Sequence, residues 1–326
     1  MAQRAKVSVA TVSRVLNGSE KVVPETRTRI QAVIDEMGYM RNSAARTLNS
    51  GRTMTVGAIV PTLDHAIFAK FLHALESRFS AQGYSLMISS SEWDADTEVN
   101  KAQAMVDMGA EALVVSGAEH SDDFISLVRR YDVPTILTSF FDPNADLPTI
   151  GYDNAKVARM AIGYLAGLGH REIAVLHGPK LNNDRTTARL EGLLSFGGDL
   201  NLDLVETTLD VQGGRLGATA AFSNNPSITA ILGLSDLLAI GALFEAQDRG
   251  VIVPSELSIM GFDNLELGTA TSPPLSTIRL GVAKMAQRTA DAICAHLANG
   301  NSLLAEEMNC DVIERNSVQK IFNTPS

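Results

Sequence analysis

Near the start of the chain, residues 8–18 carry short hydrogen-bonding side chains and one arginine at helical spacing. The outward side of this stretch presents Ala10, Ser13, Arg14 and Asn17. Such a face can lie close to a DNA duplex, because the major groove admits a helix and presents hydrogen-bonding base edges there. An ordinary amphipathic surface helix has a similar composition, so on this stretch alone both interpretations stay open.

The residues that would hold this face in place follow a helical pattern. Ser8 can cap the start of the helix with its hydroxyl, and Gly18 suits the left-handed residue at its end. Apolar residues recur on the inward side at i, i+3 and i+4, as Val12, Val15 and Leu16. The pattern therefore predicts a short helix that is anchored to a core on one side.

Flanking segments predict two further helices. Residues 2–5 favour about one helical turn, and a tight connection follows them. From Pro24 to Gly38, a Pro-Glu first turn and a closing glycine frame an apolar stripe. The stripe consists of Ile30, Val33, Ile34 and Met37. Three short helices with one shared core are typical of a small DNA-binding head.

The net charge of −10 is divided unevenly along the 326 residues. Residues 1–52 hold nine Lys or Arg and four Asp or Glu, a net +5, and the remaining residues carry −15. An even spread of negative charge would argue against nucleic acid as a partner. A basic head on an acidic body is instead the electrostatic pattern of a protein that binds DNA at one end.

After residue 55, short apolar runs alternate with helical stretches. Runs of this kind are typical of parallel strands that are buried on both faces. They lie at 56–60, 85–88, 112–115, 135–137, 173–176, 230–232 and 257–262. Helices are expected between them, at 67–82, 96–108, 154–168, 185–196 and 236–249. The pattern predicts an α/β body of two doubly wound lobes, with a ligand cleft between the lobes at the carboxyl ends of the strands.

The sequence offers no constellation for catalysis or for metal binding. It has no G-x-S-x-G elbow, no G-x-G-x-x-G after a strand and no histidine pair at metal-ligand spacing. Cys294 and Cys310 are isolated, and no apolar run is long enough to span a membrane or to act as a signal segment. We therefore expect a cytoplasmic protein that is not an enzyme and needs no cofactor or metal.

Three phrases in the head resemble one family closely. Residues 7–18 read VSVATVSRVLNG, residues 23–27 read VPETR and residues 37–39 read MGY. They resemble the DNA-binding head of the LacI/GalR family of bacterial transcription regulators. Members of that family carry several more residues before the position of Met1. The first helix is therefore expected to be truncated, and the head as written to be poorly folded.

The body continues the resemblance, which covers nearly the whole chain. Residues 168–174 (LGHREIA), 235–242 (SDLLAIGA) and 253–263 (VPSELSIMGFD) resemble the effector-binding core of the same family. That core is similar in fold to periplasmic sugar-binding proteins. The resemblance implies a helix-turn-helix head over 1–40, a hinge helix over 41–52 and a body over 53–326. It further implies that lobe 1 holds 53–150 and 281–311, and that lobe 2 holds 151–280 and 312–326.

The resemblance also implies which residues contact DNA. Val9, Ala10, Ser13 and Arg14 would face base edges, and Ser8, Thr11 and Asn17 belong to the same contact surface, with Thr11 and Asn17 toward the backbone. The hinge helix orders on the operator and pairs with its twin in this family, and Leu48 matches the wedge that enters a base step from the minor groove. On composition alone, residues 41–51 could equally be a plain polar linker.

Effector contacts carry over from the family onto Phe68, Arg189, Asp236 and Asp263. Each has a local alternative, namely core packing for Phe68, a solvated helix face for Arg189, N-capping for Asp236 and a turn for Asp263. Together, an aromatic face, an arginine fork and two carboxylates suit a sugar or sugar-like ring.

Arg185 lies in the same loop region as Arg189 and is a further candidate for effector binding. A second guanidinium would favour an anionic effector such as a sugar acid. The alternative is that Arg185 pairs with Asp184 or with Asp236.

These observations predict a sequence-specific DNA-binding transcription regulator, a repressor that acts as a homodimer or a tetramer. A sugar or sugar acid in the cleft between the lobes would control its binding to double-stranded operator DNA. The alternative is a ligand-binding protein without effective DNA binding, because its head is short. A secreted solute-binding protein is opposed by the basic head, and an enzyme by the lack of catalytic residues.

Overall fold

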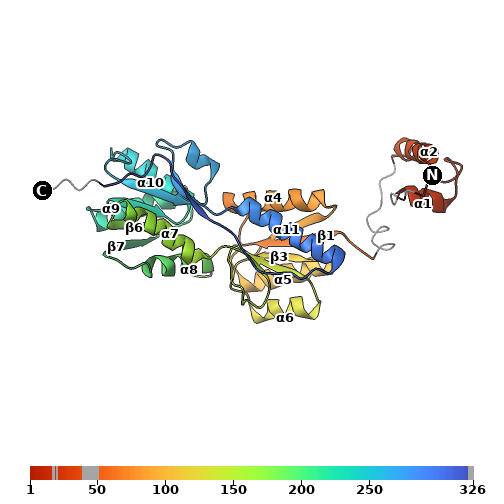
Figure 1. Cartoon of the computed structure of the whole chain (residues 1–326), viewed down its shortest axis with the longest axis horizontal. Helices are drawn as coiled ribbons and strands as arrows, with labels where there is room; N and C mark the ends of the chain where they lie inside the picture. The colour runs from red at the N-terminus through yellow and green to blue at the C-terminus, as the bar shows by residue number, and fades with distance from the viewer. Residues whose placement is uncertain (17–18, 20, 39–50, 322–326) are drawn as a thin grey trace. The chain divides into compact units, whose positions relative to one another are not determined.

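The computed structural model describes residues 1–16, 19, 21–38 and 51–321. The chain separates into two compact units, Met1–Thr53 and Met54–Ser326 (Figure 1). Two of the predicted DNA-contact residues, Asn17 and Leu48, lie outside the described residues. The hinge helix that is predicted around Leu48 lies outside them as well.

The first unit contains α1 (Val9–Leu16) and α2 (Pro24–Glu36). Ser8 caps α1, since the N–H of Thr11 donates to its Oγ at 3.1 Å. The residues before Ser8 make a single turn, in which the N–H of Ala5 donates to the carbonyl of Met1 at 2.9 Å. The small core of this unit consists of Ala5, Val12, Val15, Val22 and Ile30, with Val33 and Ile34 packed against it. Met37 was expected in the same stripe but is 44% exposed, because it follows the last turn of α2.

Lobe 1 of the body is built on a sheet of parallel strands in the order β11-β5-β4-β3-β1-β2. These strands are β1 (Thr55–Val60), β2 (Ser85–Ser90), β3 (Leu113–Ser116), β4 (Thr135–Thr138), β5 (Thr149–Gly151) and β11 (Glu306–Glu307). The helices are α4 (Ala66–Ala81), α5 (Ala95–Asp107), α6 (Asp122–Arg130) and α11 (Val282–Asn299). Alternate residues of β1 join different cores, since Ala58 and Val60 pack with α4 while Ile59 packs with α5 and α6.

Lobe 2 is built on a second sheet in the order β12-β10-β9-β8-β6-β7, in which only β12 is antiparallel among the described strands. These strands are β6 (Glu172–His177), β7 (Asn201–Glu206), β8 (Ala230–Gly233), β9 (Ser258–Phe262), β10 (Ser276–Arg279) and β12 (Asp311–Ile313). The helices are α7 (Asn154–Gly167), α8 (Asp184–Leu194), α9 (Val211–Asn224), α10 (Asp236–Asp248) and the short 3-10 helix η1 (Glu266–Thr269). The two doubly wound sheets confirm the predicted fold class.

One detail of the strand prediction is wrong. The run at 85–88 was expected to be buried on both faces, but Ile88 in β2 is 44% exposed. The reason is the sheet order, which puts β2 at the edge of its sheet. In the described residues no helix is long and apolar enough to cross a membrane.

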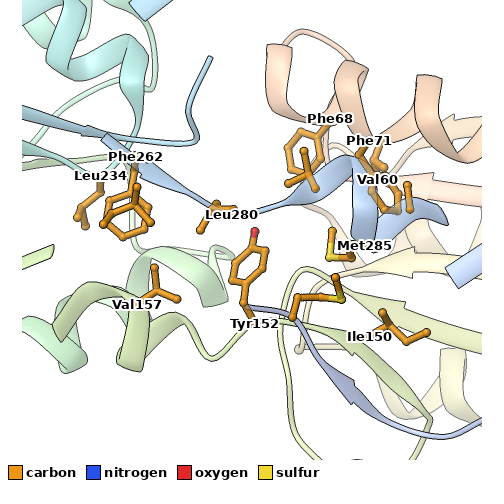
Figure 2. Close-up of a cluster of buried hydrophobic side chains, with 14 of the residues drawn as sticks. Val60, Phe68, Phe71, Ile150, Tyr152, Val157, Leu234, Phe262, Leu280 and Met285 are labelled. Atoms are coloured by element: carbon orange, nitrogen blue, oxygen red, sulfur yellow. The ribbon is translucent and has the colours of Figure 1, made fainter. Parts of the chain in front are cut away.

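The chain crosses between the lobes three times, around Tyr152, Leu280 and Met308. All three side chains are buried, and one apolar cluster runs through both lobes. Figure 2 shows Tyr152 and Leu280 in the middle of this cluster, with Phe262 on the side of lobe 2 and Met285 on the side of lobe 1. The crossings therefore form a packed joint between the lobes rather than loose linkers.

Candidate functional site

A cavity lies between the two lobes, beside the three crossings. Its empty volume is about 730 Å³, including the part that opens to solvent. Four of the five predicted effector-contact residues line it, namely Phe68, Arg185, Arg189 and Asp263. The loops after the strands and the helix starts bring these residues together.

Arg189 is held firmly in the wall of the cavity and is 8% exposed. Its Nε donates to Oδ1 of Asn154 and its Nη1 to the carbonyl of Leu234, both at 3.0 Å. The guanidinium also lies over the ring of Phe262, 4.6 Å from the ring centroid. No carboxylate forms an ion pair with it among the described residues. Arg189 is thus not the solvated helix residue of the local alternative, and it presents a positive charge to the cavity.

Arg185 reaches from α8 of lobe 2 to aromatic residues of lobe 1. Its guanidinium lies 5.1 Å from the ring centroid of Trp93 and 5.9 Å from that of Phe68. Asp184 and Asp236 were the two candidate partners of Arg185, and the structure pairs it with Asp184, whose Oδ1 is 3.4 Å from Nη1 of Arg185. The other carboxylate oxygen of Asp184 accepts a hydrogen bond from the N–H of Ala118 in lobe 1. Arg185 and Asp184 therefore bridge the lobes at the edge of the cavity.

Asp263 enters the cavity from a tight turn after β9. Its φ of 110° lies in a region that residues other than glycine seldom adopt. Its carboxylate accepts a hydrogen bond from Oγ of Ser235 at 3.1 Å. Burial raises the pKa of Asp263 to about 6, and the positive charge of Arg189 opposes this shift. Asp263 can therefore accept hydrogen bonds from ligand hydroxyl groups as a carboxylate at pH 7.

The structure places Asp236 beneath the cavity and not in its lining. The prediction of direct effector contact therefore differs from the geometry, because the first turn of α10 points this side chain toward β10. Its carboxylate accepts hydrogen bonds from the N–H of Leu265 at 2.6 Å and from Oγ1 of Thr277 at 2.5 Å. Burial, together with the negative charge of Asp263, raises the pKa of Asp236 to about 7. The N-cap of α10 is its neighbour Ser235.

Several lining residues were not singled out from the sequence. Ser139 comes directly after β4 and Trp93 lies three residues after the end of β2, and their φ values are 72° and 61°. His65, whose ring stacks on Phe68 at 6.3 Å, also lines the cavity, and burial lowers its pKa. Trp93 could have been singled out from the sequence, because it is the only tryptophan of the chain and lies after a predicted strand and before an Asp that can cap a helix.

The outward face of α1 carries those predicted DNA-contact residues that the structure describes. Ser8, Val9, Ala10, Ser13 and Arg14 are exposed, and Val9 is 76% exposed although it is apolar. Thr11 is half-buried, and its Oγ1 is 2.8 Å from Oγ of Ser8. An exposed valine among short polar residues is suited to contact with a thymine methyl group.

A helical head with an exposed α1 and a two-lobed body with a cavity between its lobes define a DNA-binding transcription regulator with an effector-binding domain. Sequence comparison identifies the family of this regulator. The chain belongs to the LacI family: residues 1–42 match the bacterial regulatory proteins of the lacI family, and residues 53–310 match the periplasmic binding proteins and sugar binding domain of the LacI family.

Relatives and solved structures agree with this assignment. The regulator MalR of Streptomyces coelicolor is 31% identical over 301 residues, covering 88% of this chain and 86% of the relative. The catabolite control protein A of Staphylococcus epidermidis is 32% identical over 287 residues, covering 85% of each chain. A lac repressor dimer bound to operator and an anti-inducer has the same fold, with a TM-score of 0.87 at 22% identity over 98% of this chain and 97% of that chain. These findings confirm the predicted family, fold class and function as a transcription regulator.

Proposed function

We propose that this regulator is a repressor that binds a near-palindromic operator as a homodimer, and that a sugar or sugar acid in the cavity controls it. A relative from Klebsiella pneumoniae that is 27% identical is the repressor PurR. The similar lac repressor structure is a dimer on its operator. We propose a cytoplasmic location as well, because a regulator of this kind acts where the chromosome is.

The side chains that line the cavity support the proposed ligand class. Asp263 offers a carboxylate to hydroxyl groups, and Phe68 and Trp93 offer ring faces. Arg189 contributes a buried cation with neutral hydrogen-bond partners, which favours a ligand that brings a negative charge. Arg185 adds a second guanidinium, which Asp184 partly neutralises. A sugar acid satisfies all of these groups, and a neutral sugar satisfies most of them.

On the DNA side, we propose that Val9, Ala10, Ser13 and Arg14 face base edges. Thr11 and Asn17 would contact the phosphate backbone, with Ser8 at the start of the same helix, and Leu48 would wedge into a base step. Effector binding would change the position of one lobe against the other, and a coupling of about 1–3 kcal/mol would change operator affinity 5- to 150-fold.

The test is thermal unfolding of the full chain with a defined panel: glucose, ribose, cellobiose, gluconate, glucuronate and glucose 6-phosphate. A ligand at 100 times its Kd should stabilise the body by about 2.7 kcal/mol. The stabilisation should be clearly smaller in Arg189→Met and Asp263→Asn, which bind the ligand more weakly, and should persist in Arg129→Met, a control at an exposed arginine of α6. If no member of the panel shifts the transition, the ligand class is wrong. A ligand that stabilises the protein should then change its affinity for operator DNA.

A further inference from the structure

The turn that presents Asp263 to the cavity has an unusual backbone. Asp263 and Asn264 follow one another with φ values of 110° and 52°, and neither is a glycine. Each such residue costs roughly 1–3 kcal/mol unless the surrounding structure holds it. The turn therefore needs contacts that keep it in this conformation.

Hydrogen bonds from the interior of lobe 2 hold the turn at each of its residues. The N–H of Asp263 donates to the carbonyl of Ile278 at 2.9 Å. The N–H of Asn264 donates to Oγ1 of Thr277 at 3.3 Å, and that of Leu265 donates to Oδ2 of Asp236 at 2.6 Å. These bonds tie the turn to β10 and to the start of α10.

Asp236 and Thr277, which both bind the turn, are also hydrogen-bonded to each other. Both are fully buried, and Oγ1 of Thr277 donates to Oδ1 of Asp236 at 2.5 Å. The space for the carboxylate exists because residue 261 is a glycine: a Cβ there would lie 2.2 Å from Oδ1 of Asp236. Of the charged groups, Asp263 and Arg315 act on the Asp236 carboxylate, and Arg315 also donates to Oδ1 of Asn264 at 2.6 Å.

The neighbour of Asp236 contacts the other side of the turn. Oγ of Ser235 donates to Oδ2 of Asp263 at 3.1 Å, and Ser235 is also the N-cap of α10. The side chain of Asp236 instead accepts from the N–H of Leu265 and so fixes the peptide that follows Asn264. An N-cap role therefore does not explain Asp236.

We propose that Asp236 and Thr277 are positioning residues for effector recognition, which hold the 263–265 turn so that the Asp263 carboxylate faces the ligand. This proposal rests on the proposed function only in taking Asp263 as a ligand contact. It assigns Asp236 a role through Asp263 in place of direct contact with the effector.

The first test needs no ligand. Thr277→Val removes the hydroxyl and little else, and Thr277→Ser keeps it. Amide hydrogen exchange in the full chain should be at least tenfold faster at Asn264 and Leu265 in Thr277→Val, since the N–H of Asn264 loses its acceptor and Asp236 loses the hydrogen bond that orients it. Thr277→Ser should exchange like the wild type. Thr289→Val is the matched control, because Thr289 is also fully buried and its hydroxyl has no partner among the described residues. Unchanged exchange in Thr277→Val would overturn the proposal.

The second test is a double-mutant cycle with gluconate and glucose as a matched acidic and neutral pair, measured by calorimetry. In the wild-type background, Thr277→Val should lower the affinity for whichever probe binds by about tenfold. In the Asp263→Asn background it should leave the affinity unchanged, because it acts through Asp263. Equal losses in both backgrounds would mean a general structural role and would contradict the proposal. If neither probe binds the wild type, these two ligands are excluded for the proposed function, and the exchange experiment alone decides the positioning role.

Discussion

Replacing Asp236 with asparagine should change the stability of the protein in a way that depends steeply on pH. Burial and the charge of Asp263 raise the pKa of Asp236 from 3.8 to about 7 in the folded state. Between these values the folded chain keeps a proton that the unfolded chain has lost. Wild-type stability therefore falls by about 1.4 kcal/mol per pH unit from this group. This contribution is fully present below pH 3.8 and is lost as pH rises through 7.

Asparagine has no proton to lose, so the variant escapes this loss. The difference in free energy of unfolding between Asp236→Asn and wild type should increase by about 2.5 kcal/mol from pH 5 to pH 8 in favour of the variant. Urea denaturation of the full chain at pH 5, 6, 7 and 8 measures it. Asp248→Asn is the control on the same helix, since its carboxylate is 61% exposed and its removal should matter by less than about 1 kcal/mol at any pH. A difference that stays constant across this range would refute the reasoning from burial.

Three further changes test other parts of the structure. Phe79→Ala, at a fully buried position in lobe 1, should cost about 3–5 kcal/mol in urea denaturation, and a loss below 1 kcal/mol would show that the site is loosely packed. Asn154→Ala leaves Nε of Arg189 without its acceptor and should weaken gluconate binding about tenfold in calorimetry, whereas unchanged affinity would mean that Arg189 does not need this support. Ser8→Ala removes the cap of α1 and should destabilise the helix by about 0.5–2 kcal/mol, seen as faster amide exchange at Thr11.

Sequence patterns were sufficient for much of the site. The carboxyl ends of parallel strands meet at one edge of a sheet, so residues that follow strands, such as Asp263, converge there. Helix starts lie at the same edge, which brings in Arg185 and Arg189 from α8. The family motifs then identified which of these residues to consider.

The sequence could not predict that Asp236 is buried beneath the cavity lining. Ser235 and Asp236 are neighbours at the start of α10, and one lines the cavity while the other lies beneath it. Which side chain faces inward depends on the left-handed turn after β9. The Asp263-Asn264 pair indicates a turn, since both residue types tolerate positive φ, but it does not indicate which neighbouring side chain the turn buries. The predicted runs also lack five strands. For β5, β11 and β12 the reason is that two or three residues are too few to show a period, whereas β7 and β10 are longer and were missed although their length allows one.

The three crossings between the lobes also fix the order in which the chain can fold during synthesis. Lobe 1 begins at β1 but needs α11, which packs against α4, and β11 at 306–307. At about 5–20 residues per second, the roughly 150 residues between β5 and β11 take about 8–30 s to synthesise. All of lobe 2 except β12 emerges in that interval. The lobe that starts first is therefore completed late, and the part of α4 that packs against α11 stays uncovered until α11 is made.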